Sequence, residues 1–161
     1  NRYLLTSLDI SNNKTISVNT QDISICTGLT NLNLIDSMAT GDIANLSTLT
    51  NLEILNAKKT SGSGDLSSLA GLSKLCYFTN WNLQNTWSSQ DLRPSSSKII
   101  SGEFRFATAT DTDNFLINMA KCQASDKKQI YFQQSHRTRA SDAAVSTLQG
   151  KGYTLSQLIT D

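Results

Sequence analysis

A repeat of 23 residues constrains the fold of this chain more than any other feature. Residues 26–48, CTGLTNLNLIDSMATGDIANLST, align without a gap with residues 49–71, LTNLEILNAKKTSGSGDLSSLAG. The same shift carries Leu32 onto Leu55, and a second step of 23 carries Leu55 onto Phe78. Repeats of this length are typical of solenoids, in which each repeat forms one coil that stacks on its neighbours.

The spacing of apolar residues within a repeat indicates how one coil folds. The segment LxxLxL ends in a two-residue alternation, which predicts a short strand with one buried face. The segment GDIxxLxxL has apolar residues every three positions, which is typical of a 3₁₀-like return path. One coil cannot bury its own leucines, so coils must stack and their strands must form a parallel sheet. The predicted strands, one for each of about seven coils, are residues 7–10, 31–34, 54–57, 77–80, 103–106, 129–132 and 152–155.

Three segments of the chain resemble the leucine-rich-repeat family: residues 5–13 (LTSLDISNN), 29–37 (LTNLNLIDS) and 49–60 (LTNLEILNAKKT). The GDI and GDL segments resemble the form of the repeat whose convex side carries GxIPxxL, with Asp in place of Pro. The resemblance implies an α/β fold, a right-handed solenoid with its parallel β-sheet on the concave face. The family's asparagine after LxL is present as Asn13 but is replaced in later coils, so their turns must be stabilised differently.

The pattern changes along the chain, and we interpret residues 1–161 as a single solenoid domain with three parts. Residues 1–83 carry the regular repeats, residues 84–101 read as an irregular coil, and residues 102–161 contain longer repeats with helices. The tail contains DNFLINMAKC at residues 113–122, KQIYF at 128–132 and SDAAVSTLQGKGYTL at 141–155. With these segments it resembles the C-terminal repeat modules of Bacteroidetes surface proteins and of virion proteins from their phages. That resemblance implies that the domain is the C-terminal part of a larger extracellular, virion or bacterial cell-surface protein.

Charge and hydropathy disfavour two classes of partner. The formal net charge is +1, so the chain lacks the strongly basic surface that nucleic-acid binding requires. No apolar run approaches the roughly 18 residues of a membrane-spanning helix. We therefore expect neither nucleic-acid binding nor membrane insertion.

Residues suited to catalysis or metal binding are scarce. The single histidine, His136, is expected in a loop after a strand, and the sequence shows no carboxylate partner for it. The three cysteines lack the paired spacing of a zinc site. Asp111 and Asp113 are interpreted as caps of the following helix rather than as calcium ligands. We predict no enzyme activity, no cofactor and no metal.

The outward-facing residues of the predicted strands form the candidate site. In the first coils they are mostly small and polar, whereas the later coils bring large aromatic and charged side chains onto adjoining strands. Such residues on a rigid sheet are typical of binding hot spots, although β-propensity alone also places them on a pleated surface. The candidate ligand-binding residues are Lys58, Tyr77, Trp81, Glu103, Arg105 and Tyr131.

Two functions remain open at this point. In one, the concave face binds a protein or a surface glycan without catalysis. In the other, the domain is a structural spacer or assembly element of a virion and has no ligand of its own. We also expect a neighbouring chain or an upstream segment to cover the first coil, because Tyr3, Leu4, Leu5 and Leu8 follow no recognisable cap.

Overall fold

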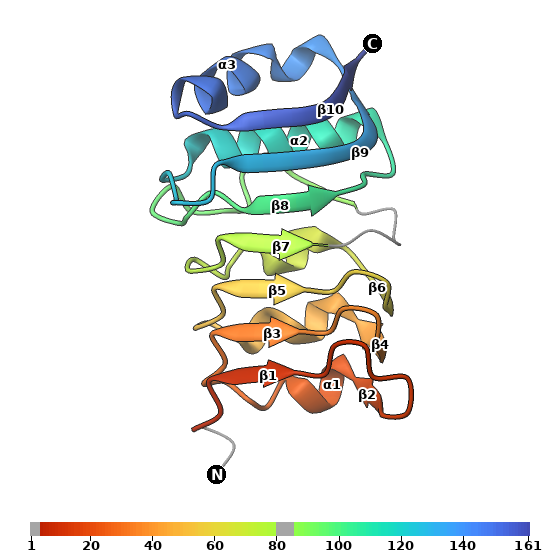
Figure 1. The fold of residues 1–161 in the computed structure, drawn as a ribbon. Coiled ribbons are helices and arrows are strands. Elements are labelled where there is room, and N and C mark those ends of the chain that lie inside the picture. Colours follow the sequence, from red (N-terminus) through yellow and green to blue (C-terminus); the bar gives the residue numbers. More distant parts are fainter. Residues whose placement is uncertain (1–3, 80–85) are drawn as a thin grey trace.

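A computed structural model describes residues 4–79 and 86–161 of the chain. Its main element is a seven-stranded parallel sheet whose strands follow one another in chain order (Figure 1). The order confirms the α/β prediction with a parallel sheet, because each strand pairs with the next strand of this sheet along the chain. The strands are β1 (Ser7–Asp9), β3 (Asn31–Asn33), β5 (Ile54–Asn56), β7 (Tyr77–Thr79), β8 (Ser101–Phe104), β9 (Gln129–Arg137) and β10 (Thr154–Thr160).

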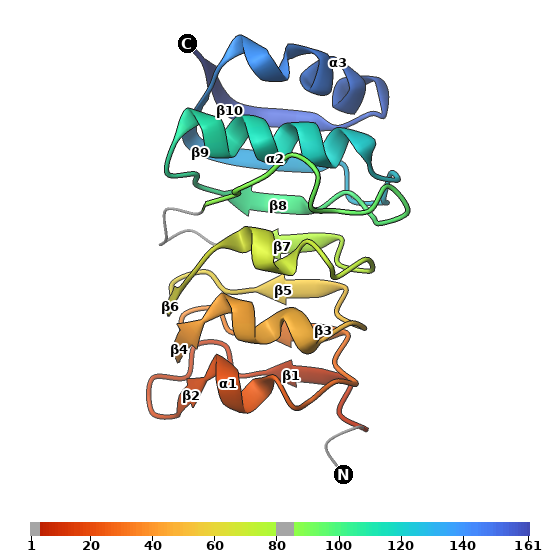
Figure 2. The same cartoon turned by 180° about the vertical axis from the view of Figure 1, so that it is seen from behind.

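The return paths form a second layer behind this sheet (Figure 2). In the first coils this layer contains a small parallel sheet, made by β2 (Ser17–Asn19), β4 (Met38–Asp42) and β6 (Ser61–Ser63). Short helices follow the strands of this small sheet, and the return paths of the last coils contain the longer helices α2 (Ala109–Lys121) and α3 (Asp142–Gly150). The short helices of this layer are α1 (Thr20–Ile23), η1 (Ile43–Thr48), η2 (Leu66–Leu69) and η3 (Arg139–Ser141).

A ladder of apolar side chains between the two layers joins the coils. Leu8 pairs with Leu32, Leu32 with Leu55, and Leu55 with Phe78. Each of the last three is at most 1% exposed, because it has neighbours in the coils on both sides. The registers confirm the prediction for the first four strands of the main sheet.

The register differs from the prediction at β8 and at β10. In β10, Leu155 rather than Tyr153 pairs with Ile130, so that strand lies two residues later than predicted. In β8 the shift has the opposite direction. Residue 102 pairs with Phe78, and Glu103 pairs with both Thr79 and Tyr131, so the strand lies two residues earlier than predicted. A slip of two residues keeps each side chain on its face of the sheet but moves it along the strand. The prediction aligned Phe104 and Phe106 with the leucine pair, whereas the structure places a glycine at the first of these positions.

The recurring Gly-Asp pairs have a local explanation. Asp42 Oδ1 accepts a hydrogen bond from Ala44 N at 2.9 Å and caps η1, and Asp65 caps η2 in the same way. The preceding Gly41 has φ +102°, and a Cβ there would lie 2.5 Å from Asn19 Oδ1 of the previous coil. These pairs therefore begin the short helices and allow close stacking, which confirms a turn role for both aspartates.

A buried arginine anchors the irregular segment that precedes β8. Arg93 is 3% exposed, and burial lowers the pKa of its guanidinium to about 10. Its side-chain nitrogens donate to four backbone carbonyls, those of Ala70, Leu72, Leu75 and Lys98, at 2.8–3.2 Å. The arginine thereby joins the irregular segment to the backbone of residues 70–75 in the preceding coil.

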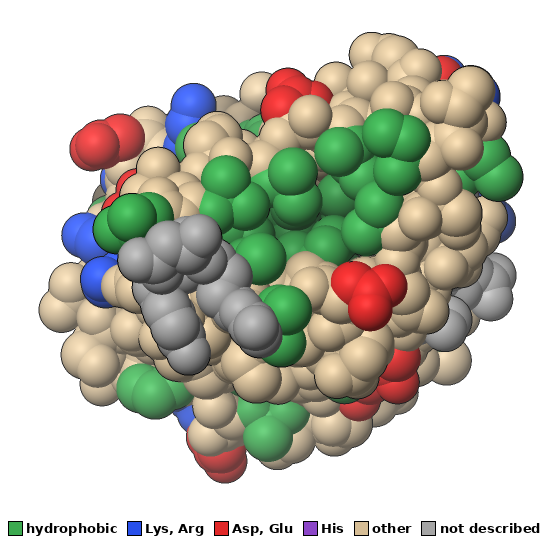
Figure 3. Space-filling model, turned by 90° about the horizontal axis from the view of Figure 1, so that it is seen from below, with side chains coloured by type: hydrophobic (Ala, Val, Ile, Leu, Met, Phe, Trp, Pro, Cys, Tyr) green, Lys and Arg blue, Asp and Glu red, His purple; other side chains and the backbone are tan. Residues whose placement is uncertain are grey.

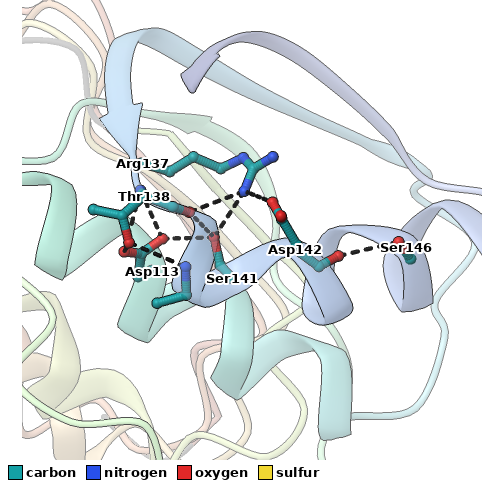
Figure 4. Close-up of polar contacts among 7 residues, drawn as sticks. Asp113, Arg137, Thr138, Ser141, Asp142 and Ser146 are labelled. Atoms are coloured by element: carbon teal, nitrogen blue, oxygen red, sulfur yellow. Dashed lines mark hydrogen bonds and ion pairs between the residues drawn. The ribbon is translucent and has the colours of Figure 1, made fainter. Parts of the chain in front are cut away.

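The longer coils at the C-terminal end are joined by a polar network (Figure 4). Asp113 of α2 is buried and accepts hydrogen bonds from Thr138 N at 3.1 Å and Ser141 Oγ at 2.5 Å. Arg137 donates from the same turn to Asp142 Oδ1 at 2.6 Å. The carboxylate of Asp113 thus holds the start of the next helix.

This network corrects the prediction that both aspartates cap α2. The N-cap of α2 is Thr108, whose Oγ1 accepts a hydrogen bond from Asp111 N at 3.1 Å. Asp111 belongs to this cap, since its carboxylate accepts from Thr108 Oγ1 at 2.5 Å. Asp113 lies inside the helix and caps the following coil, a partnership between residues 25 positions apart that local pattern does not reveal.

Leu55→Ala should lower the free energy of unfolding by about 2–5 kcal/mol, because it leaves a cavity in the fully buried ladder. Leu8→Ala provides the matched control, since Leu8 occupies the same position in the first coil and is only partly buried. We expect its loss to be less than half as large. Urea unfolding of both variants measures this, and equal losses would contradict the assigned burial.

Gly102→Ala should destabilise the protein by more than about 3 kcal/mol. Residue 102 has φ +133°, and a Cβ would lie 1.7 Å from the carbonyl oxygen of Phe78. Gly150→Ala is the control, because a Cβ there meets nothing within 4 Å. Thermal unfolding compares the two, and a Gly102→Ala variant as stable as the control would show that β8 does not approach β7 so closely.

Candidate binding surface

The outward-facing side chains of the main sheet form one continuous row across the strands. In pairing order the row consists of Asp9, Asn33, Asn56, Thr79, Glu103, Tyr131 and Ser156. In the first coils these groups bind one another. Asn33 Nδ2 donates to Asp9 Oδ2 at 3.0 Å, and Thr79 Oγ1 donates to Asn56 Oδ1 at 3.2 Å. The hydrogen-bonding capacity of this part of the row is thus partly used within the protein.

The row opens into a hollow of about 230 Å³ where β7, β8 and β9 adjoin. It is lined by Tyr77, Gly102, Glu103, Gln129 and Tyr131. On this face the neighbour of Tyr77 in β8 is the small Ser101, which leaves space beside the tyrosine. We call it the tyrosine hollow.

A carboxylate with a buried oxygen lies at the tyrosine hollow. Glu103 Oε2 is shielded from solvent and accepts no hydrogen bond from the residues that the structure describes. Lys58 Nζ lies 3.5 Å from the same oxygen, which is an ion-pair distance without hydrogen-bond geometry. The side chains of Lys58 and Glu103 are 23% and 28% exposed, so both remain accessible from the open face.

Tyr77 combines a polar and an apolar surface at the same place. Burial, and secondarily the charge of Glu103, raise the pKa of its phenol above the ordinary value of 10.0. Lys127 Nζ lies 5.7 Å from the centre of its ring, within cation–π range. The phenol therefore remains a neutral hydrogen-bond donor at physiological pH.

The structure places Arg105 beside the tyrosine hollow rather than in it. Arg105 is exposed just beyond the end of β8 and lines a second hollow of about 330 Å³, together with Tyr131, Gln133, Gln134 and Gln157. Gln134 and Gln157 have φ of +51° and +56°, where β9 and β10 depart from regular pairing. The sequence analysis missed this glutamine-lined hollow, whose shape depends on these left-handed residues.

The remaining predicted site residues have different outcomes. Tyr131 lines both hollows and so connects them. Lys58 reaches the site through its ion pair with Glu103. Trp81 lies outside the described residues. Tyr77, Glu103, Tyr131 and Lys58 are therefore brought together by the fold, and Arg105 is adjacent to them.

The histidine environment differs from the prediction. His136 lies in strand β9 rather than in a loop, and its Nδ1 is 2.6 Å from Asp161 Oδ1. Within residues 4–79 and 86–161, no group of three or more His, Cys, Asp and Glu side chains could hold a metal ion. Among the same residues, no helix is long and apolar enough to cross a membrane.

Comparison with known proteins gives a fold and no family. No protein-family model matches the chain, and neither does any curated protein. The crystal structure of an internalin from Listeria monocytogenes str. 4b F2365 is similar, with a TM-score of 0.51 and 18% sequence identity. The match covers 99% of this chain and 57% of the internalin chain. It supports a leucine-rich-repeat fold, and at this identity the likeness concerns the fold alone.

Glu103→Gln should lower the pKa of Tyr77 while leaving it above 10.0, because burial is the larger cause of its shift and persists in the variant. Titration of labelled tyrosine by NMR measures this pKa. Lys128→Gln is the control, since Lys128 lies 4.8 Å from the ring of Tyr153 rather than at Tyr77. An unchanged Tyr77 pKa in Glu103→Gln would mean that the carboxylate does not act on the phenol.

Proposed function

We propose that the chain is a non-enzymatic recognition module that binds a partner protein through the outward face of its main sheet. In this proposal the chain forms a right-handed leucine-rich-repeat solenoid of about seven coils, and the binding face is concave. The observation that carries the proposal is the tyrosine hollow, in which two tyrosines and a partly buried carboxylate converge on one open face.

The residues at the hollow suit a protein interface. Tyrosines supply large contact areas and lose little conformational entropy when they are fixed, and they are enriched at binding hot spots. The side chain of Glu103 is 28% exposed although its Oε2 is buried, so a partner's N–H or O–H group would approach the carboxylate from the open face. Parallel strands on both sides hold these side chains in place, so binding requires little reorganisation.

Charges around the hollow favour a partner with hydrogen-bond donors that is not itself strongly basic. Lys58 pairs with Glu103, Lys127 lies over Tyr77, and Arg105 is exposed at the adjoining hollow. These three cations would repel a basic surface at short range. We further propose an extracellular location, on a virion or a bacterial cell surface, which rests on the resemblances found in the sequence.

Tyr77→Ala and Tyr131→Ala should each weaken binding by about 2 kcal/mol, roughly 30-fold in Kd. The parent and both variants are tested against an array of bacterial surface proteins and an array of bacterial glycans. Leu92→Ala is the matched control, because Leu92 is an exposed apolar residue on the irregular segment. Circular dichroism melts verify that each variant folds.

Three results would contradict the proposal. Protein binding that the tyrosine variants retain in full would move the function to another surface. Binding to glycans alone would identify a sugar as the ligand of the hollow. Absence of binding in both arrays would favour the alternative, a structural spacer or assembly element.

A further inference from the structure

The N-terminal end of the stack presents a contiguous apolar surface (Figure 3). Its most exposed members are Leu4, Leu5, Ile16 and Ile25, at 73%, 38%, 50% and 47% exposure. Leu8, Ile10, Val18 and Cys26 are partly buried beside them and pack against the core. The first coil thus offers apolar side chains on the side that faces away from the second coil.

The equivalent positions are buried one coil later. Leu8 pairs with Leu32, which is 0% exposed, and Val18 pairs with Ala39, which is 2% exposed. Leu5 corresponds to Leu29 in the repeat, and Leu29 is also 0% exposed. The first coil therefore exposes apolar positions that are buried in the second coil, where the preceding coil covers them.

Two strand edges accompany the apolar surface. Within residues 4–79 and 86–161, β1 ends the main sheet and β2 ends the small sheet, and each pairs with a neighbour on one side only. Their sequences, Ser-Leu-Asp and Ser-Val-Asn, contain neither the lysine nor the proline that often blocks pairing at an edge. The second coil pairs with both strands at once, since β3 pairs with β1 and β4 pairs with β2, so a coil of the same shape could pair with both free edges.

We infer that this end is the stacking surface for one further coil of the same repeat, supplied by chain upstream of Asn1. Such a coil would place leucines on the apolar surface and pair in parallel with both β1 and β2, about 4.8 Å away. A single helix would cover the leucines but leave both edges unpaired. A two-fold dimer would have to pair β1 with β1 in antiparallel orientation, against the parallel order of the stack.

The inference can be tested with the chain's own repeat. A copy of residues 29–51 is joined directly to Leu5 in place of residues 1–4, which reproduces the natural junction between residues 51 and 52. We expect the melting temperature to rise by about 5 °C or more, because one buried interface is added. The amide hydrogens of Leu8 and Val18 should also exchange more slowly. The matched control carries the same extension with Asp at the copied positions 29, 32 and 34, and should show neither effect.

A second variant keeps the test decisive if the melting temperatures alone are ambiguous. Leu5→Ala should lower the melting temperature by less than about 2 °C in the parent, where the side chain is 38% exposed. In the extended chain it should cost about 5 °C or more, because the added coil buries Leu5. Equal effects in both chains, with unchanged exchange at Leu8, would overturn the inference. A parent dimer at micromolar concentration that Leu5→Asp abolishes would overturn it in favour of a second copy.

Discussion

Stacking between neighbouring coils is the interaction on which the rest of this structure depends. Leu32 and Leu55 are fully buried, and the side chains directly above and below them in the ladder belong to other coils. A coil taken alone would expose these leucines, so its strand and helix have no independent stability. The hydrogen bonds along the outward row and the caps of the short helices both recur at the period that this stacking sets.

The candidate site lies where the 23-residue period is interrupted, although the sheet itself is continuous. Between β7 and β8 the chain runs through an irregular segment held by Arg93, after which β8 carries a glycine where its neighbours carry large residues. Gly102 lets β8 approach the backbone of Phe78. Residue 102 then pairs with Ile130, 28 positions later, and the longer coil accommodates the 13-residue helix α2. The tyrosine hollow lies on the open face of β7, β8 and β9.

Alternation along a strand was sufficient to find most of the site. Tyr77, Glu103 and Tyr131 face outward because side chains on a strand alternate between its faces, and a register error of two residues does not alter this. The same error placed Arg105 in the central row, and the structure moves it to the adjoining hollow. The position of a side chain along the strand depends on which residues of β7 and β8 pair. The segment before β8 lacks the repeat pattern, so the sequence did not reveal this pairing.

The sequence by itself determined the repeat, the parallel order of the strands and the buried ladder of the first four coils, because each follows from local spacing at a constant period. Tertiary structure decided the register of β8, the partnership of Asp113 with the next helix and the hydrogen bond between His136 and Asp161. Each of these joins residues from different coils where the period is broken. Once coil length varies, spacing along the chain no longer specifies which residues of two coils lie opposite each other, and packing between coils does.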